Sequence, residues 1–134
     1  MANNHKVFIS HAWDHSDDLE NLRRLLNERG YFNVEFKEAT KDEPINSSNS
    51  YYIKNRLREK IQSSDILIGL CGIYASHSEW MKWELEIANI HGIPIVGVIP
   101  RGQIYISRTV DSYSIENVNW NTESIVNAIR RNSK

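Results

Sequence analysis

The sequence predicts an α/β domain in which a five-stranded parallel sheet carries helices on both faces. Short apolar runs of strand length alternate along the chain with segments whose apolar residues recur every three or four positions. The interior runs at Asp65–Gly72 (DILIGLCG) and Gly92–Pro100 (GIPIVGVIP) are apolar without alternation, which indicates strands buried on both faces. These patterns favour a flavodoxin-like three-layer sandwich with strand order 2-1-3-4-5.

The first half of the chain is expected to supply two strands and two helices. The unbroken run KVFIS at Lys6–Ser10 predicts a central strand, and four leucines on one face predict a helix over Ser16–Arg29. The segment Asn33–Glu38 alternates as an edge strand does, and a second helix is expected at Tyr51–Ser63. Between them, the polar segment Ala39–Ser50 predicts a long loop, and long loops in compact domains are usually functional.

The second half continues the alternation after the strand at Asp65–Gly72. The segment Ser78–Ala88 has helical periodicity, and Ser76 with Glu79 forms a capping-box pattern at its start. The remaining chain is expected to contain, in order, the strand Gly92–Pro100, an irregular or short-helical stretch over 101–116, an edge strand over 117–120 and a last helix over 122–131.

Composition limits the kind of protein. A length of 134 residues predicts one domain with a single sizeable core. The formal net charge of −1 gives no strong attraction toward nucleic acid or a membrane surface, so neither is expected as a partner. The single cysteine, Cys71, excludes an internal disulfide and suits a reducing, cytoplasmic location, and no long apolar run or signal peptide is present.

Glu84 interrupts the apolar face of the helix expected at Ser78–Ala88. Trp80, Trp83 and Ile87 define a stripe at helical spacing, and Glu84 lies inside it. A carboxylate at the margin of the helix that reaches water or pairs with a Lys or Arg would explain this equally well. Charged residues are seldom buried without a reason, however, so we take Glu84 as the candidate catalytic residue, with Trp80 and Trp83 as apolar walls.

The expected strand order places a crevice between the first and third strands. Doubly wound sheets bind ligands beyond the carboxyl ends of the strands at the point where strand order reverses. The candidate substrate-binding residues at that edge are Ser10, His11, Ala12, Gly72 and, in the polar loop, Thr40.

Other residues carry weaker signals. No phosphate-binding glycine loop or metal-ligand spacing occurs, and Ser10 next to His11 is no triad because adjacent strand residues face opposite ways. Cys71 lies in a buried strand and is expected to pack in the core. Trp13 and Trp120 could stack on a ligand base, although packing is the more common role for a tryptophan.

Three segments resemble TIR domains when they are taken in order along the chain. VFISHAWD resembles the first-strand motif of that family, and SDILIGLCGIYASHSEWMKWELEIA resembles its third strand, loop and helix. The helix motif S-x-W-C-x-x-E-L is matched by Ser78, Trp80, Glu84 and Leu85, with Met81 in place of the usual cysteine. The resemblance covers roughly Lys6 to Pro100 and implies a single TIR-like domain over residues 1–134.

The resemblance implies an activity. In catalytic TIR domains the glutamate that matches Glu84 cleaves NAD between nicotinamide and ribose, so NAD is expected as substrate, with no resident cofactor and no metal. A compact chain of this sort is most similar to bacterial antiphage proteins of the Thoeris sensor type. The similarity implies an ADP-ribose-derived signal that activates a separate effector protein, self-association on activation and a phage-derived trigger.

Two other functions remain open from the sequence. The chain could be a non-catalytic TIR interaction module, because fold alone does not determine function. It could also be an enzyme similar to nucleoside deoxyribosyltransferases, which share the architecture and use a glutamate on a related bond. The Trp-x-x-x-Glu spacing and the first-strand motif favour the TIR interpretation.

Overall fold

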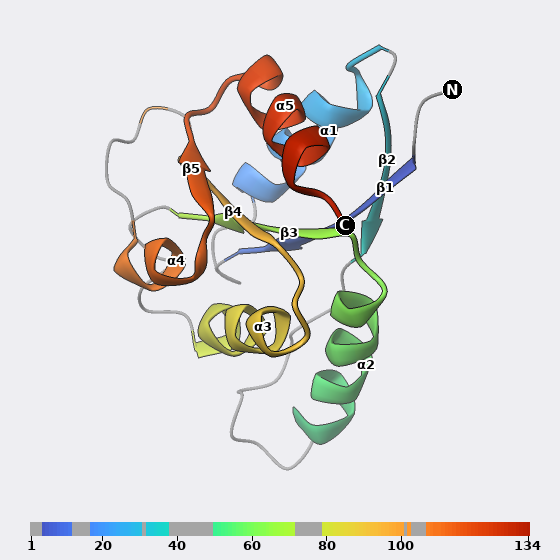
Figure 1. The fold of residues 1–134 in the computed structure, drawn as a ribbon, viewed down its shortest axis with the longest axis vertical. Helices are drawn as coiled ribbons and strands as arrows, with labels where there is room; N and C mark the ends of the chain where they lie inside the picture. Colours follow the sequence, from blue (N-terminus) through green and yellow to red (C-terminus); the bar gives the residue numbers. More distant parts are fainter. Residues whose placement is uncertain are drawn as a thin grey trace.

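The computed structural model describes residues 4–11, 17–30, 32–37, 50–71, 79–100, 102 and 107–134. Strands and helices alternate along the described chain, as the hydrophobic pattern predicts (Figure 1). They are β1 (Asn4–Ser10), α1 (Asp17–Asn27), β2 (Asn33–Lys37), α2 (Ser50–Gln62), β3 (Ile66–Leu70), α3 (Glu79–Ile90), β4 (Ile95–Val98), α4 (Arg108–Tyr113), β5 (Glu116–Val118) and α5 (Thr122–Asn132).

The five strands form one parallel sheet in the order β2-β1-β3-β4-β5, which confirms the predicted fold class. Every residue of β3 and β4 is buried, whereas β5 at one edge is half-exposed along its length. This gradient explains why the central strands have unbroken apolar sequences. The register pairs Ser10 at the end of β1 with Gly69 of β3, so β1 and β3 end side by side where the order reverses.

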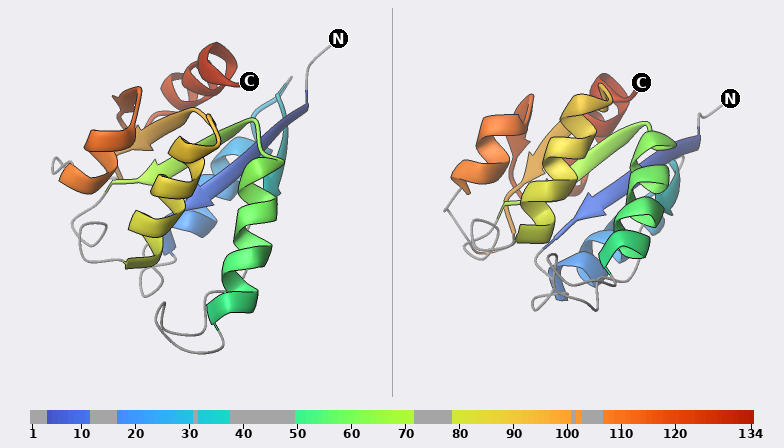
Figure 2. Two further views of the ribbon diagram at one scale, coloured as in Figure 1. Left: turned by 60° about the horizontal axis from the view of Figure 1, so that its bottom comes forward. Right: turned by 90° about the horizontal axis from the view of Figure 1, so that it is seen from below.

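Helices cover both faces of the sheet (Figure 2), and an apolar core lies on each face. Alternation along β1 sends Phe8 to the face covered by α2, α3 and α4, and sends Val7 and Ile9 to the face covered by α1 and α5. Neighbouring residues of one strand therefore serve different layers. We refer to these layers below as the α3 face and the α1–α5 face.

Several element boundaries differ from those expected. The last strand begins at Glu116 and ends at Val118, so Trp120 lies beyond it. Ser50 is the buried first residue of α2 and not the end of the polar loop. A short helix, α4, forms within the stretch expected to be irregular or short-helical, and Ser107 caps it by accepting a hydrogen bond from the Val110 amide. Ser16, where the first helix was expected to begin, and the expected capping residue Ser76 lie outside the described residues.

The close approach of α4 to the sheet depends on Gly97. A Cβ atom built there would collide with the side-chain oxygen of Asn117 and would lie 3.2 Å from a methyl group of Val110. Asn117 is itself held by Ser114, whose hydroxyl donates to it at 2.9 Å, and it donates to Asp111 at 2.7 Å. A glycine in this strand thus leaves room for a polar network that joins β5 to α4.

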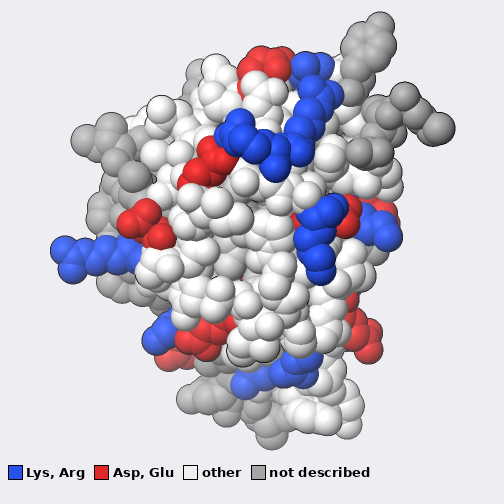
Figure 3. Space-filling model, viewed as in Figure 1, with Lys and Arg blue, Asp and Glu red and all other residues white. Residues whose placement is uncertain are grey.

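The surface carries both signs of charge. On the face seen in Figure 3, acidic and basic side chains are interspersed, in keeping with the net charge of −1. Of the helices in the described residues, none has the length and apolar character required to cross a bilayer.

Candidate active site

Ser10 and Glu84 meet on the α3 face, close to the carboxyl end of β1. Ser10 is the last residue of β1 and alternates with Phe8, which belongs to the core of that face. Its hydroxyl donates a hydrogen bond to Glu84 Oε1 at 2.7 Å, across 74 residues of sequence. Both residues are completely buried, at 0% exposure. The strand and the helix thus present polar side chains to each other among the apolar side chains of this layer.

Helix α3 carries Glu84 within its buried stripe, as the periodicity predicts. The buried residues of this helix are Trp80, Met81, Glu84, Leu85, Ile87 and Ala88. Glu84 therefore does not lie at a solvent-exposed margin of the helix, which was the simpler explanation of its position. Its second oxygen, Oε2, is also shielded from solvent.

Burial makes the hydrogen bond from Ser10 important. Moving a carboxylate out of water is costly unless hydrogen bonds replace its hydration. A hydrogen bond to a charged group contributes about 1.5–3 kcal/mol to stability, and a buried pair also keeps its side chains in a single orientation. The arrangement can therefore hold a carboxylate rigidly, as a group that stabilises a developing positive charge must be held.

The two tryptophans beside Glu84 differ in burial. Trp80 is buried in the core, whereas Trp83 is only partly buried and packs against that core from its margin. The sequence pattern placed both tryptophans in the buried stripe. This is wrong for Trp83, which is only partly buried. Their rings meet edge to face, with centroids 5.9 Å apart and planes at 86°. They form an aromatic wall on the helix that carries Glu84.

Arg58 contacts the Trp83 ring, and the sequence pattern did not predict this contact. It projects from α2, and its guanidinium carbon lies 5.6 Å from the centroid of the Trp83 ring. Its Nη1 also donates to Asn55 Oδ1 at 3.0 Å. The only available signal was its place next to Leu57, at the edge of the buried stripe of α2. Arg58 joins α2 to the aromatic wall through a cation–π contact.

His11 follows β1 directly and is buried, with its Nδ1 shielded from solvent. It lies next to Ser10 in the chain and so at the same edge of the sheet. The other candidates, Ala12, Thr40 and Gly72, lie outside the described residues, as do residues 39–49 of the polar loop. The structure therefore joins Ser10 to Glu84 and places Trp80 and Trp83 on the helix that carries Glu84, while the roles of all eight residues stay predictions.

Cys71 follows β3 and packs in the core of the α3 face, as expected. Burial raises the pKa of its thiol to about 12. A thiol with such a pKa is protonated at neutral pH and is a poor nucleophile, since the thiolate is the reactive form. Within the described part of the chain, His, Cys, Asp and Glu form no group of three or more that could hold a metal ion.

The order of the sheet and the helices on both of its faces define an α/β domain of flavodoxin-like fold, which is consistent with a TIR domain. The sequence matches the family model described as Thoeris protein ThsB, TIR-like domain, over residues 8–105, which is more than half of the chain. The chain belongs to this family and is a Thoeris-type TIR protein. No curated protein matches the sequence.

Several solved structures share the fold. A 2-deoxyribosyltransferase from Bacillus psychrosaccharolyticus is 20% identical, with a TM-score of 0.63 over 91% of this chain and 90% of that chain. The CMP N-glycosidase BcmB of Clostridium botulinum is 16% identical, with a TM-score of 0.55 over 93% and 98%. A prokaryotic SEFIR domain is 13% identical, with a TM-score of 0.50 over 95% and 88%. At these identities the likeness concerns the fold alone.

Proposed function

We propose that this protein is an NAD-consuming enzyme of antiphage defence. It cleaves the bond between nicotinamide and ribose and converts the ADP-ribose part into a cyclic or conjugated signal that activates a separate effector protein. The observation that carries the proposal is the buried pair in which Ser10 holds Glu84 at 2.7 Å. Membership of the Thoeris TIR-like family supports the biological setting.

Cleavage of the nicotinamide–ribose bond requires one carboxylate held in a fixed position. As the glycosidic bond breaks, its electron pair goes to the nicotinamide ring nitrogen, which becomes neutral, and positive charge develops at the anomeric carbon. A carboxylate close to the ribose stabilises that charge. Because nicotinamide is already a cationic leaving group, no general acid is needed, and Glu84 can act without the second carboxylate of ordinary glycosidases.

The surroundings of Glu84 suit the second half of the reaction. A hydroxyl of the same molecule, or a nucleophile of another, attacks the anomeric carbon and gives its proton to the carboxylate of Glu84, which returns the proton to solvent when the product leaves. Exclusion of water favours that capture over hydrolysis to free ADP-ribose. The buried stripe of α3 and the wall of Trp80 and Trp83 supply apolar surroundings for this step.

One experiment separates this function from its two rivals. The concentrated protein, with and without extract of phage-infected cells, is incubated with NAD, and separately with pairs of deoxynucleosides and free bases, and products are identified by mass spectrometry. Release of nicotinamide with an ADP-ribose-derived product supports the proposal. Exchange of bases between deoxyribosides would identify a deoxyribosyltransferase-like enzyme, and no product under activating conditions would identify an interaction module.

Control of the activity is part of the proposal. An always-active NAD consumer would drain its host, so we expect the dilute protein to be nearly inactive. A trigger from infected cells then favours a competent, self-associated state. Holding activity near 1% requires the resting state to be favoured by about 2.8 kcal/mol, since each 1.4 kcal/mol or so is tenfold in population. The check is a protein concentration series with NAD, with and without extract of phage-infected cells. Rapid turnover by dilute protein alone would contradict such control.

A further inference from the structure

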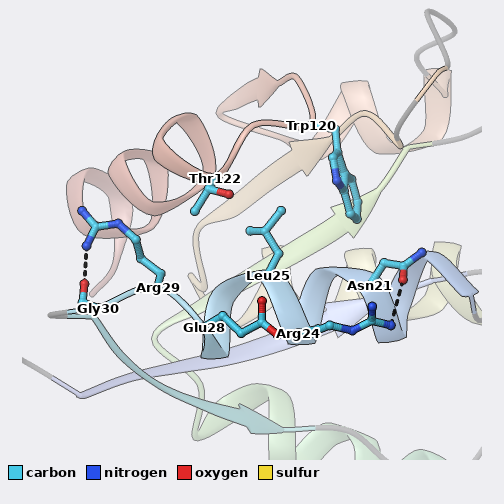
Figure 4. A pocket seen from close by; sticks show the side chains of 8 residues that line it. All are labelled: Asn21, Arg24, Leu25, Glu28, Arg29, Gly30, Trp120 and Thr122. Carbon is cyan, nitrogen blue, oxygen red and sulfur yellow. Dashed lines mark hydrogen bonds between the residues drawn. The ribbon is translucent and has the colours of Figure 1, made fainter.

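A hollow of about 530 Å³ lies on the α1–α5 face, on the other side of the sheet from Glu84 (Figure 4). Its volume is within the range of small-molecule sites, about 300–1,000 Å³. The hollow is bordered by α1, by the junction of β5 with α5 and by the start of α5. Its lining includes Asn21, Arg24, Leu25, Glu28, Trp120 and Thr122.

An ion pair joins the two helices that border the hollow. Arg29, after the end of α1, donates to both carboxylate oxygens of Glu123 in α5, at 2.7 and 3.2 Å, and also to the Gly30 carbonyl. Figure 4 shows the Arg29 side chain turned toward Gly30, at the end of the hollow away from Trp120. Arg29 is therefore occupied in holding the walls together.

Arg24 is differently placed. It is exposed on α1, and its Nη2 donates to Asn21 Oδ1 at 3.2 Å, which leaves most of its N–H groups for another acceptor. No ion pair of Arg24 with a carboxylate is found among the described residues. A guanidinium in this state is suited to bind a phosphate through paired hydrogen bonds.

Trp120 supplies an aromatic wall. It lies between β5 and α5, is partly buried against the core of the α1–α5 face, and borders the hollow together with Leu25. Figure 4 shows its ring extending toward α1, above the turn that carries Asn21. Stacking of a base on such a ring is worth about 1–3 kcal/mol.

Glu28 narrows the choice of ligand. Its carboxylate borders the same hollow and would repel a bare anion, but it can accept hydrogen bonds from hydroxyl groups. Arg24 and Glu28 are four residues apart on α1, which corresponds to about 6 Å along a helix. A ligand that carries an aromatic ring, a phosphate and free hydroxyls would match Trp120, Arg24 and Glu28, respectively.

We propose that this hollow is a second binding site and that it takes a nucleoside 5′-phosphate. The base stacks on Trp120, the phosphate binds Arg24, and the ribose hydroxyls donate to Glu28. The site is distinct from the proposed NAD-cleaving site, because Trp120 and Glu84 belong to opposite faces of the sheet. Its occupancy does not require the protein to be an enzyme.

The test is a titration of the full-length ¹⁵N-labelled protein with AMP, followed by NMR of the tryptophan indole N–H signals. The chain has four tryptophans, and Trp120→Phe identifies the signal of Trp120 by its loss. We expect AMP to move the Trp120 signal saturably, with a dissociation constant of about 1 mM or lower. Adenosine, inorganic phosphate and 2′,3′-dideoxy-AMP should each bind at least about tenfold more weakly. Adenosine lacks the phosphate, dideoxy-AMP lacks the ribose hydroxyls, and inorganic phosphate lacks both the base and the hydroxyls.

Two arginine variants complete the test. Arg24→Gln should weaken AMP binding at least about tenfold, whereas Arg56→Gln, which removes an exposed arginine of α2 on the other face, should leave it unchanged. An unmoved Trp120 signal at about 10 mM AMP would overturn the site. So would equal binding by Arg24→Gln, or an equal effect of inorganic phosphate. Shifts confined to the signals of Trp80 and Trp83 would also overturn it, while leaving the proposed NAD site standing.

Discussion

The two faces of the sheet differ in how far they bury a carboxylate. On the α3 face, the carboxylate of Glu84 is completely buried and is held by the equally buried hydroxyl of Ser10. On the α1–α5 face, the carboxylate of Glu123 is 59% exposed and its partner Arg29 is 25% exposed, beside an open hollow. Both contacts have the same length, 2.7 Å.

Equal distances therefore do not mean equal energies. A surface ion pair is screened by water and salt and contributes little, whereas a buried polar group that loses its partner bears the full cost of desolvation. On the α3 face, the buried hydrogen bond from Ser10 holds the carboxylate of Glu84 in one orientation. The α1–α5 face leaves its charged groups available to solvent and ligands.

Ser10→Ala should have the largest effect on folding. It leaves Glu84 Oε1 buried without its donor, so we expect the free energy of unfolding to fall by about 1–3 kcal/mol. NAD turnover should also drop, by about 10- to 100-fold, because a carboxylate that is no longer held loses its orientation. Urea unfolding and a nicotinamide-release assay measure the two effects.

The matched control for Ser10→Ala is Ser112→Ala. Ser112 is exposed on α4 and donates to the Thr109 carbonyl at 2.9 Å. Its loss should change stability by less than about 0.5 kcal/mol. If Ser10→Ala and Ser112→Ala lowered the free energy of unfolding equally, burial of the hydrogen bond would not explain the effect of Ser10→Ala.

The contact between Ser10 and Glu84 also marks the limit of what the sequence could predict. Periodicity placed Glu84 in a buried stripe, and the apolar runs predicted the strand order, because both patterns follow directly from burial. Ser10 was expected to touch substrate. Its partner is 74 residues away, and hydrophobic pattern carries no information about such a polar contact. Arg58 was missed for the same reason, since only the packing of α2 on α3 brings it over Trp83.

The stability of the protein should depend on pH through His5, which belongs to the α1–α5 face. His5 stacks on Phe32 with ring centroids 5.4 Å apart. Burial lowers the pKa of His5 from 6.5; Arg130 lowers it further, whereas Asp65 acts in the opposite direction. The unfolded chain therefore takes up the proton first, so stability should be full above about pH 6.5 and should decline as the pH falls below it.

His5→Phe keeps an aromatic ring beside Phe32 and removes the titratable group. We expect the melting temperature of this variant to depend less on pH than that of the wild type between about pH 7.5 and about pH 5.5. His91→Gln, a substitution at a half-buried histidine after α3, serves as the control and should keep the wild-type dependence. A wild-type slope in His5→Phe would show that another group causes the decline.

The smallest effect is expected at the exposed pair. Hydrogen bonds from Arg29 lower the pKa of Glu123, so the contribution of this carboxylate to stability is present above its ordinary pKa and is lost as the pH falls through the lowered value. Glu123→Gln at neutral pH should destabilise the protein much less than Ser10→Ala, and the difference from wild type should shrink in high salt. Urea unfolding at low and high salt provides the measurement. A loss as large as that of Ser10→Ala would contradict the contrast between the faces.

Glu84→Gln asks whether the buried carboxylate of Glu84 performs NAD cleavage, as we propose. The amide keeps the shape of the side chain but cannot carry the negative charge that stabilises the developing cation. Nicotinamide release is measured with the trigger present, beside Glu59→Gln, a control at an exposed position of α2, and folding is checked by circular dichroism. We expect a folded Glu84→Gln protein to lose at least about a hundredfold in turnover, while Glu59→Gln retains wild-type activity. A folded Glu84→Gln protein with turnover within about threefold of wild type would contradict this proposal, since about 0.7 kcal/mol is too little for a catalytic charge.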